Sequence, residues 1–167
     1  AGSGFTATAK DRFEDALTYV ASVLNVDPAL NVFLNVKVNA PNSISGSGII
    51  AAGGTFFVFG RDDFEHGIAF DQITTGVTVV KNPEITLEVD FDNPLYMGVD
   101  QPGSSEIDLY SVLVHELTHS LGFFSLSTSN GTSQLPMYSF LDKLLTIGAS
   151  GDALFGGSPP SLLGSVS

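Results

Sequence analysis

Apolar side chains recur with two different periods along the first half of the chain. Residues 9 to 24 place a phenylalanine, two leucines and a valine three or four positions apart, which predicts an amphipathic helix. Asp27 and Pro28 end that pattern. Valine and leucine then alternate with other residues, which is typical of strands with one buried face. Strands are predicted at residues 31 to 40, 49 to 60, 76 to 81 and 84 to 91.

A longer apolar pattern in the second half predicts a helix of about four turns, from residue 107 to residue 121. Ser104 or Ser105 can cap its start, and Gly122 is a natural stop. Turn signals before the helix, among them Asn-Pro and Gln-Pro-Gly, predict a loop over residues 92 to 104. Helical spacing returns at residues 137 to 148, which predicts a second, shorter helix.

The length of 167 residues and an apolar content of 43% predict one globular domain that spans the whole chain, residues 1 to 167. The mixture of helices and strands predicts the α+β class. We expect an N-terminal subdomain over about residues 1 to 122 and a C-terminal subdomain over about 123 to 167. We also expect that this C-terminal part is cut before its natural end.

Charge and cysteine content narrow the function. Six basic and 18 acidic residues give a net charge of -12, which repels phosphate backbones and anionic lipid headgroups and argues against nucleic-acid partners. No apolar run approaches the roughly 20 residues that span a bilayer, so no membrane insertion is expected. Cysteine is absent, which excludes disulfides and thiolate metal sites. Few lysines, many polar residues and the lack of an initiator methionine favour a mature protein that is secreted or at the cell surface.

The stretch VLVHELTHSLGFFS, residues 112 to 125, places two of the three histidines four positions apart, at His115 and His119. Residues i and i+4 project from one face of a helix, so both imidazoles can bind one ion. Glu116 follows the first histidine and can accept a proton from a water on that ion. This is the chemistry of the H-E-x-x-H motif, in which zinc lowers the pKa of water towards about 7. The glutamate takes the proton as the water attacks a carbonyl and passes it to the leaving amine.

A buried helix that happens to carry two histidines is the alternative interpretation. Burying two imidazoles and a carboxylate without partners is costly. Strands before the helix and a glycine at its end give the motif a suitable context, so we expect a zinc site.

The segment HELTHSLGFFS resembles the active-site helix of zincin metallopeptidases. It is especially similar to H-E-x-x-H-x-x-G-F sequences of secreted bacterial proteins with a leishmanolysin- or metzincin-like catalytic domain. Also similar to that group are LYMGVDQPGSSEIDLYSVLVHELTHSLGF, SFLDKLL after the motif, and FEDALTYVASVLNVDPALNVFLNVKV near the start. The resemblance implies a zincin-like fold, in which a mixed twisted sheet has a backing helix, an active-site helix and a small C-terminal subdomain.

The third protein ligand does not come from this helix. Metzincins follow H-E-x-x-H-x-x-G-x-x-H, which would put a histidine where this chain has Ser125, and a neutral hydroxyl is a poor zinc ligand. His66 lies upstream, whereas zincins draw this ligand from downstream. Downstream, Asp142 and Asp152 carry the carboxylates. Asp142 lies among leucines and resembles the aspartate that completes the His-His-Asp set of aspzincins, so we expect it to bind zinc; a solvated residue beside Lys143 is the alternative.

Met137 and Tyr138 allow two functional interpretations. A methionine before a tyrosine downstream of the motif resembles the Met-turn of metzincins, an apolar floor beneath the metal. Alternatively, Tyr138 lies four residues before Asp142, on the same helical face, and could hydrogen-bond the oxyanion that develops in the reaction. Side chains that only fill the lower core are the structural alternative. Tyr138 is therefore a candidate catalytic residue.

Acidic residues gather at the end of the last predicted strand, in EVDFDNP. Oxygen-rich loops suit Ca²⁺, which makes a structural calcium site a further hypothesis, although EF-hand spacing is absent and solvated acids are the default. The candidate ligands are Glu88, Asp90, Asp92, Asn93 and Asp100. The same segment is a candidate edge strand that could pair with an extended substrate.

We therefore expect a secreted zinc metalloendopeptidase that acts on a protein or peptide substrate. His115, His119 and Asp142 would bind the metal, and Glu116 would be the general base and acid. One rival is a catalytically weak or inactive zincin-fold module for binding or adhesion, which Ser125 favours and the intact Glu116 opposes. The other is a zinc hydrolase that acts on something other than peptide bonds.

Overall fold

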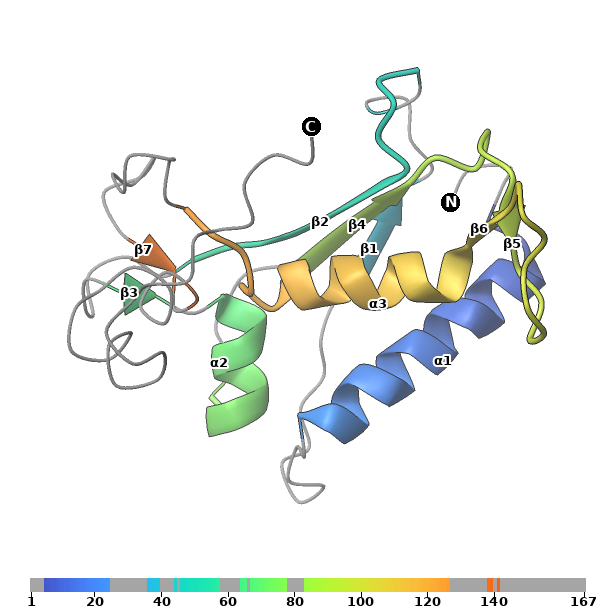
Figure 1. Ribbon diagram of the computed structural model, residues 1–167. Coiled ribbons are helices and arrows are strands. Elements are labelled where there is room, and N and C mark those ends of the chain that lie inside the picture. The colour runs from blue at the N-terminus through green and yellow to red at the C-terminus, as the bar shows by residue number, and fades with distance from the viewer. Residues whose placement is uncertain are drawn as a thin grey trace, which may run out of the picture.

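A computed structural model describes residues 5–24, 36–39, 44, 46–57, 64–65, 67–77, 83–126, 138–139 and 141. In these residues the chain forms three helices and seven short strands in a mixed α/β arrangement (Figure 1). In chain order they are α1 (Ala7–Val23), β1 (Val36–Asn39), β2 (Ala51–Thr55), β3 (Phe64–Glu65), α2 (Ile68–Thr75), β4 (Ile85–Val89), β5 (Leu95–Tyr96), β6 (Ile107–Asp108), α3 (Leu109–Ser120) and β7 (Tyr138–Ser139). None of the described helices is long and apolar enough to cross a membrane.

Helix α1 confirms the first predicted helix. Thr6 caps it, because its hydroxyl accepts a hydrogen bond from the Ala9 N–H at 3.2 Å. One face of the helix buries Ala9, Phe13 and Ala16, while charged residues occupy the opposite face. The helical period that the sequence shows is therefore the period of burial.

The three-stranded sheet has the order β1-β4-β2, with β4 parallel to β1 and antiparallel to β2. Strand β4 buries Ile85, Leu87 and Val89 and leaves the residues between them partly exposed, as the alternation predicts. The prediction that the acidic segment forms an edge strand is wrong, because β4 pairs on both sides. Within the described part of this sheet, β2 is an edge strand.

Helix α3 is the element that joins the sheet to α1. It packs against α1 on one flank and against β2 and β4 on the other, and Figure 1 shows α1 beside α3 with the sheet behind. The two helices and β4 share one apolar cluster, to which α3 contributes Leu109, Leu113 and Leu117. Burial of these leucines fixes the rotation of α3 about its own axis. That rotation decides which residues of the H-E-x-x-H motif face away from the core.

A glycine in β2 sets how closely the sheet approaches α3. A Cβ atom on Gly53 would lie 2.8 Å from the carbonyl carbon of Glu116 and 2.8 Å from the Ser120 hydroxyl oxygen. It would lie closer still to the Glu116 carbonyl oxygen. A side chain at this position is therefore incompatible with the present packing of the strand on the helix.

Helix α2 is not predicted by the sequence pattern. It buries Ile68, Ala69 and Ile73, and Gly76 ends it in the left-handed conformation with φ 71°. Of the strand predicted at residues 76 to 81, residues 76–77 are described, and they belong to the end of this helix and the turn after it.

Two predictions for the second half are wrong. Asp108, rather than Ser104 or Ser105, caps α3, and its carboxylate accepts a hydrogen bond from the Ser111 N–H at 3.1 Å. The helix cannot begin earlier, because the residues just before it form strand β6, which pairs with β5. Strand β5 itself lies within residues 92 to 104, where a loop was predicted. Residues 138–139 are not the start of a helix, because they pair with β3 as the parallel strand β7, whereas Leu141, farther along the predicted helix, is helical. Most of the expected C-terminal subdomain lies outside the described residues.

Candidate metal centre

His115 and His119 lie one turn apart on α3, as the motif predicts. Their Nε2 atoms face each other at 2.9 Å, and their rings meet edge to face with centroids 4.4 Å apart. His115 is exposed and His119 is partly buried. The two nitrogens therefore converge on one point at the surface of the helix rather than in the core.

The end of α3 fixes which nitrogen of His119 is available. Gly122 adopts φ 94° and donates its N–H to the His119 carbonyl at 2.8 Å, while the Phe123 N–H reaches the Thr118 carbonyl at 3.2 Å. These two bonds form a Schellman motif, which needs a glycine at the left-handed position. The turn brings the Phe123 carbonyl oxygen to 3.1 Å from Nδ1 of His119. A carbonyl can only accept, so Nδ1 carries the proton and Nε2 presents its lone pair.

This arrangement fits a bound zinc ion. Two nitrogens on one tetrahedral zinc lie about 3.3–3.4 Å apart, because each Zn–N bond is about 2.0–2.1 Å long. The observed separation is 2.9 Å, so the two rings would move apart by a few tenths of an ångström to hold the ion. Two facing lone pairs at this distance repel unless a proton on His115 or a cation lies between them. Histidines that bind metals usually donate their other N–H to a carbonyl or carboxylate, as His119 does.

Glu116 lies on the flank of α3 that faces β2. Its side chain is 8% exposed, and its backbone carbonyl accepts a hydrogen bond from the Ser120 hydroxyl at 2.8 Å. Among the described residues no basic side chain pairs with its carboxylate; the ion pairs there join Lys10 to Glu14 and Arg12 to Asp15.

The third ligand is not found among the described residues, where no three histidine or acidic side chains cluster closely enough to hold a metal ion. Ser125 is described and partly exposed, just beyond the Schellman turn. The candidates Asp142, Asp152 and His66 all lie outside the described residues. The role of Asp142 therefore stays a prediction.

Tyr138 is described through its backbone alone. Because it belongs to β7, the argument that it shares a helical face with Asp142 is wrong. Met137 and the Tyr138 side chain lie outside what the structure describes, so the Met-turn and oxyanion interpretations stay predictions.

The acidic segment after β4 folds as a local turn. Asp90 is buried, its carboxylate accepts a hydrogen bond from the Asp92 N–H at 3.1 Å, and its carbonyl accepts one from the Asn93 side chain at 3.1 Å. These bonds give Asp90 a structural role as the organiser of the turn. Calcium binding by Glu88, Asp100 and their neighbours stays a prediction.

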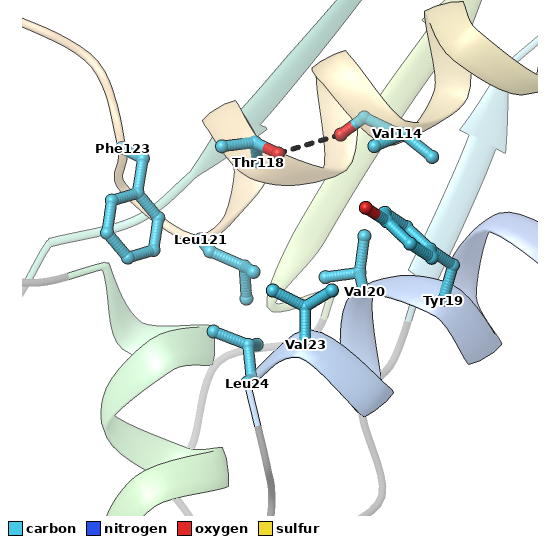
Figure 2. Close-up of a pocket in the computed structure, with 8 residues that line it drawn as sticks. All are labelled: Tyr19, Val20, Val23, Leu24, Val114, Thr118, Leu121 and Phe123. Atoms are coloured by element: carbon cyan, nitrogen blue, oxygen red, sulfur yellow. Dashed lines mark hydrogen bonds between the residues drawn. The ribbon is translucent and has the colours of Figure 1, made fainter.

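A pocket of about 340 Å³ lies on the next flank of α3, between this helix and α1. Figure 2 shows aliphatic side chains of both helices facing one another across it. Its lining residues are Tyr19, Val20, Val23, Leu24, Val114, Thr118, Leu121 and Phe123. They include no histidine and no carboxylate, and the Thr118 hydroxyl already donates to the Val114 carbonyl at 2.8 Å. The pocket is therefore separate from the histidine pair.

Comparison with protein-family models, with curated proteins and with solved structures finds no match for the chain. The geometry of the histidine pair is therefore the observation from which function is inferred. One group of this site, the Phe123 carbonyl, could not be predicted from the sequence, because every residue type has a backbone carbonyl. Sequence reasoning also missed the ring of Phe124 beside His119 and the ring of Phe57 beside Phe124, which come from different parts of the chain.

Proposed function

We propose that the protein is a secreted zinc-dependent metalloendopeptidase that hydrolyses peptide bonds in protein or peptide substrates. The observation that carries this proposal is the convergence of the His115 and His119 Nε2 atoms at 2.9 Å, with Nδ1 of His119 held by the Phe123 carbonyl. The mixed sheet, with α3 against it and α1 beside α3, supports a zincin-like fold. The small number of lysines and the many polar residues support secretion.

In this proposal the residues of α3 have different roles. His115 and His119 hold the ion through Nε2, and Asp142 completes the set. When bound, zinc supplies a Lewis acid that polarises the scissile carbonyl and lowers the pKa of the attacking water. Glu116 takes the proton from the attacking water and delivers it to the leaving amine. Tyr138 is the candidate donor to the oxyanion, and substrate approaches from the exposed side of His115.

Replacement of Glu116 tests the enzymatic function. Glu116→Ala should keep stoichiometric zinc and lower peptide hydrolysis by about 10²–10⁴-fold, the usual contribution of a positioned acid or base. Glu14→Ala, the same change on the exposed face of α1, is the control and should retain activity. A zinc-loaded parent protein that cleaves no peptide in a diverse library would contradict the proposal. It would favour the inactive binding module, which the serine at position 125 supports.

Replacement of Asp142 tests the third ligand. Asp142→Ala should weaken zinc binding by more than about 100-fold, since even loss of an outer-shell partner costs 10–100-fold. Zinc content after dialysis and competition with a chelator measure the effect. Asp152→Ala and His66→Ala are the comparison variants. The assignment is wrong if Asp142→Ala retains the affinity of the parent protein or if one of the comparison variants loses zinc instead.

A further inference from the structure

Two phenylalanine rings extend from the histidine pair, with Phe124 beside His119 and Phe57 beside Phe124. The ring of Phe124 meets the ring of His119 with centroids 6.2 Å apart and an angle of 76° between the planes. The ring of Phe57 meets Phe124 in turn, with centroids 5.5 Å apart and the same angle. Both phenylalanines are partly exposed. The three rings form a continuous series that leads from the candidate metal centre to the end of β2.

Two separate parts of the chain bring these rings together. Phe57 follows the edge strand β2 and forms an antiparallel bridge with Gly67. Phe124 follows the Schellman turn at the end of α3 and donates its N–H to the Gly122 carbonyl at 3.0 Å. The backbone bonds at both places fix the rings independently of each other.

The aromatic pair Phe57–Phe124 is not part of the main core. Within the described residues, the apolar cluster shared by α1, α3 and β4 includes neither ring, whereas Phe123 packs against that cluster and against Phe70, at 5.5 Å. The two consecutive phenylalanines therefore have different neighbours. Phe123 packs against the core cluster, and Phe124 contacts His119. Core stability explains Phe123 but gives no reason for two partly exposed rings outside the core cluster, one of them beside His119.

We propose that the aromatic pair Phe57–Phe124 is a binding subsite for an aromatic or large apolar side chain of the substrate, next to the bond that is cleaved. Edge-to-face pairs leave ring faces and edges free for a third ring, and such contacts favour aromatic over small side chains. The position beside His119 places this subsite within a side-chain length of the candidate metal centre. The inference deepens the proposed function and rests on it.

Amino-acid hydroxamates test the subsite without requiring turnover, because the hydroxamate group chelates zinc directly. The zinc-loaded full chain is titrated with phenylalanine hydroxamate and with glycine hydroxamate, and the ratio of the two Kd values is measured. We expect the phenylalanine compound to bind about five- to tenfold more tightly, as an aromatic contact of about 1 kcal/mol or slightly more predicts. Phe124→Ala should bring the ratio close to one while glycine hydroxamate binds as before.

Phe56→Ala is the matched control. Phe56 is 47% exposed and directly precedes Phe57, and successive side chains of an extended chain point to opposite faces. This variant should preserve the ratio. If Phe124→Ala does not fold, Phe124→Leu, which nearly keeps the volume, should lower the ratio to about half or less of the parent value. Equal binding of both hydroxamates to the parent protein, or an equal loss in Phe56→Ala, overturns the subsite and leaves the zinc site intact. Failure to bind zinc at all overturns the proposed function and the subsite together.

Discussion

The contact between Gly53 and α3 gives the sharpest test of the packing around the motif. In Gly53→Ala the new methyl group would lie 2.8 Å from both the Glu116 carbonyl carbon and the Ser120 hydroxyl, and closer still to the Glu116 carbonyl oxygen. Heavy atoms in contact normally lie about 3.5–4.0 Å apart, and a helix backbone cannot yield as the end of a flexible side chain can. Overpacking of this kind costs about 1–3 kcal/mol. We expect the upper end, because two of the obstructing atoms belong to the backbone.

The neighbouring position provides the control. A Cβ atom on Gly54 would meet no atom within 4 Å, so Gly54→Ala adds the same methyl group to the same strand without a clash. This change should be neutral or should stabilise the protein by about 0.4–1 kcal/mol, because alanine restricts the unfolded chain.

Urea titration followed by circular dichroism measures both variants, with thermal unfolding as a second readout. A loss of about 2–3 kcal/mol in Gly53→Ala lowers the Tm by roughly 4–12 °C in a chain of this size. Zinc affinity should fall as well, because the helix must shift with its histidines. Equal stability of Gly53→Ala and Gly54→Ala would refute the reasoning, since it would mean that β2 does not approach α3 as described.

Two further predictions concern the ends of α3. Asp108→Ala should destabilise the protein by about 1 kcal/mol, because the carboxylate caps the Ser111 N–H at 3.1 Å, and chemical denaturation should show no such loss for the exposed Asp100→Ala. In the zinc-free protein at pH 8, nitrogen NMR shifts should show His119 protonated on Nδ1, because the Phe123 carbonyl accepts from that atom. Protonation on Nε2 instead would contradict the proposed orientation of the ring.

The elements with a strong local period could be predicted from the sequence. Helices α1 and α3 and strand β4 each carry an apolar repeat long enough to decide between helix and strand, and each lies where that repeat predicts. The glycine at 122 also marked the end of α3 correctly, since the left-handed turn there needs a residue without a side chain. The spacing of four residues also predicted correctly that both histidines lie on one face of α3.

The elements that depend on distant partners could not be predicted in this way. Strands β5, β6 and β7 have two residues each and exist because another segment pairs with them, which no local pattern records. For the same reason the sequence did not show that β4 lies in the middle of the sheet. Gly53 did carry a usable signal, because glycine inside a strand often marks a close backbone approach, although its neighbour Gly54 meets no atom within 4 Å.

The third ligand is the part of the candidate site that the described residues do not supply. On sequence, His66 is set aside because zincins take this ligand from downstream. Its neighbour Gly67 nevertheless packs on the end of α3, where an added Cβ atom would lie 2.9 Å from the Leu121 carbonyl oxygen. Strand β3 ends one residue before His66, and its parallel partner β7 ends three residues before Asp142. Because paired parallel strands end at the same edge, the described residues Glu65 and Ser139 lie side by side. Zinc binding by His66→Ala and Asp142→Ala distinguishes a histidine from a carboxylate as the missing ligand.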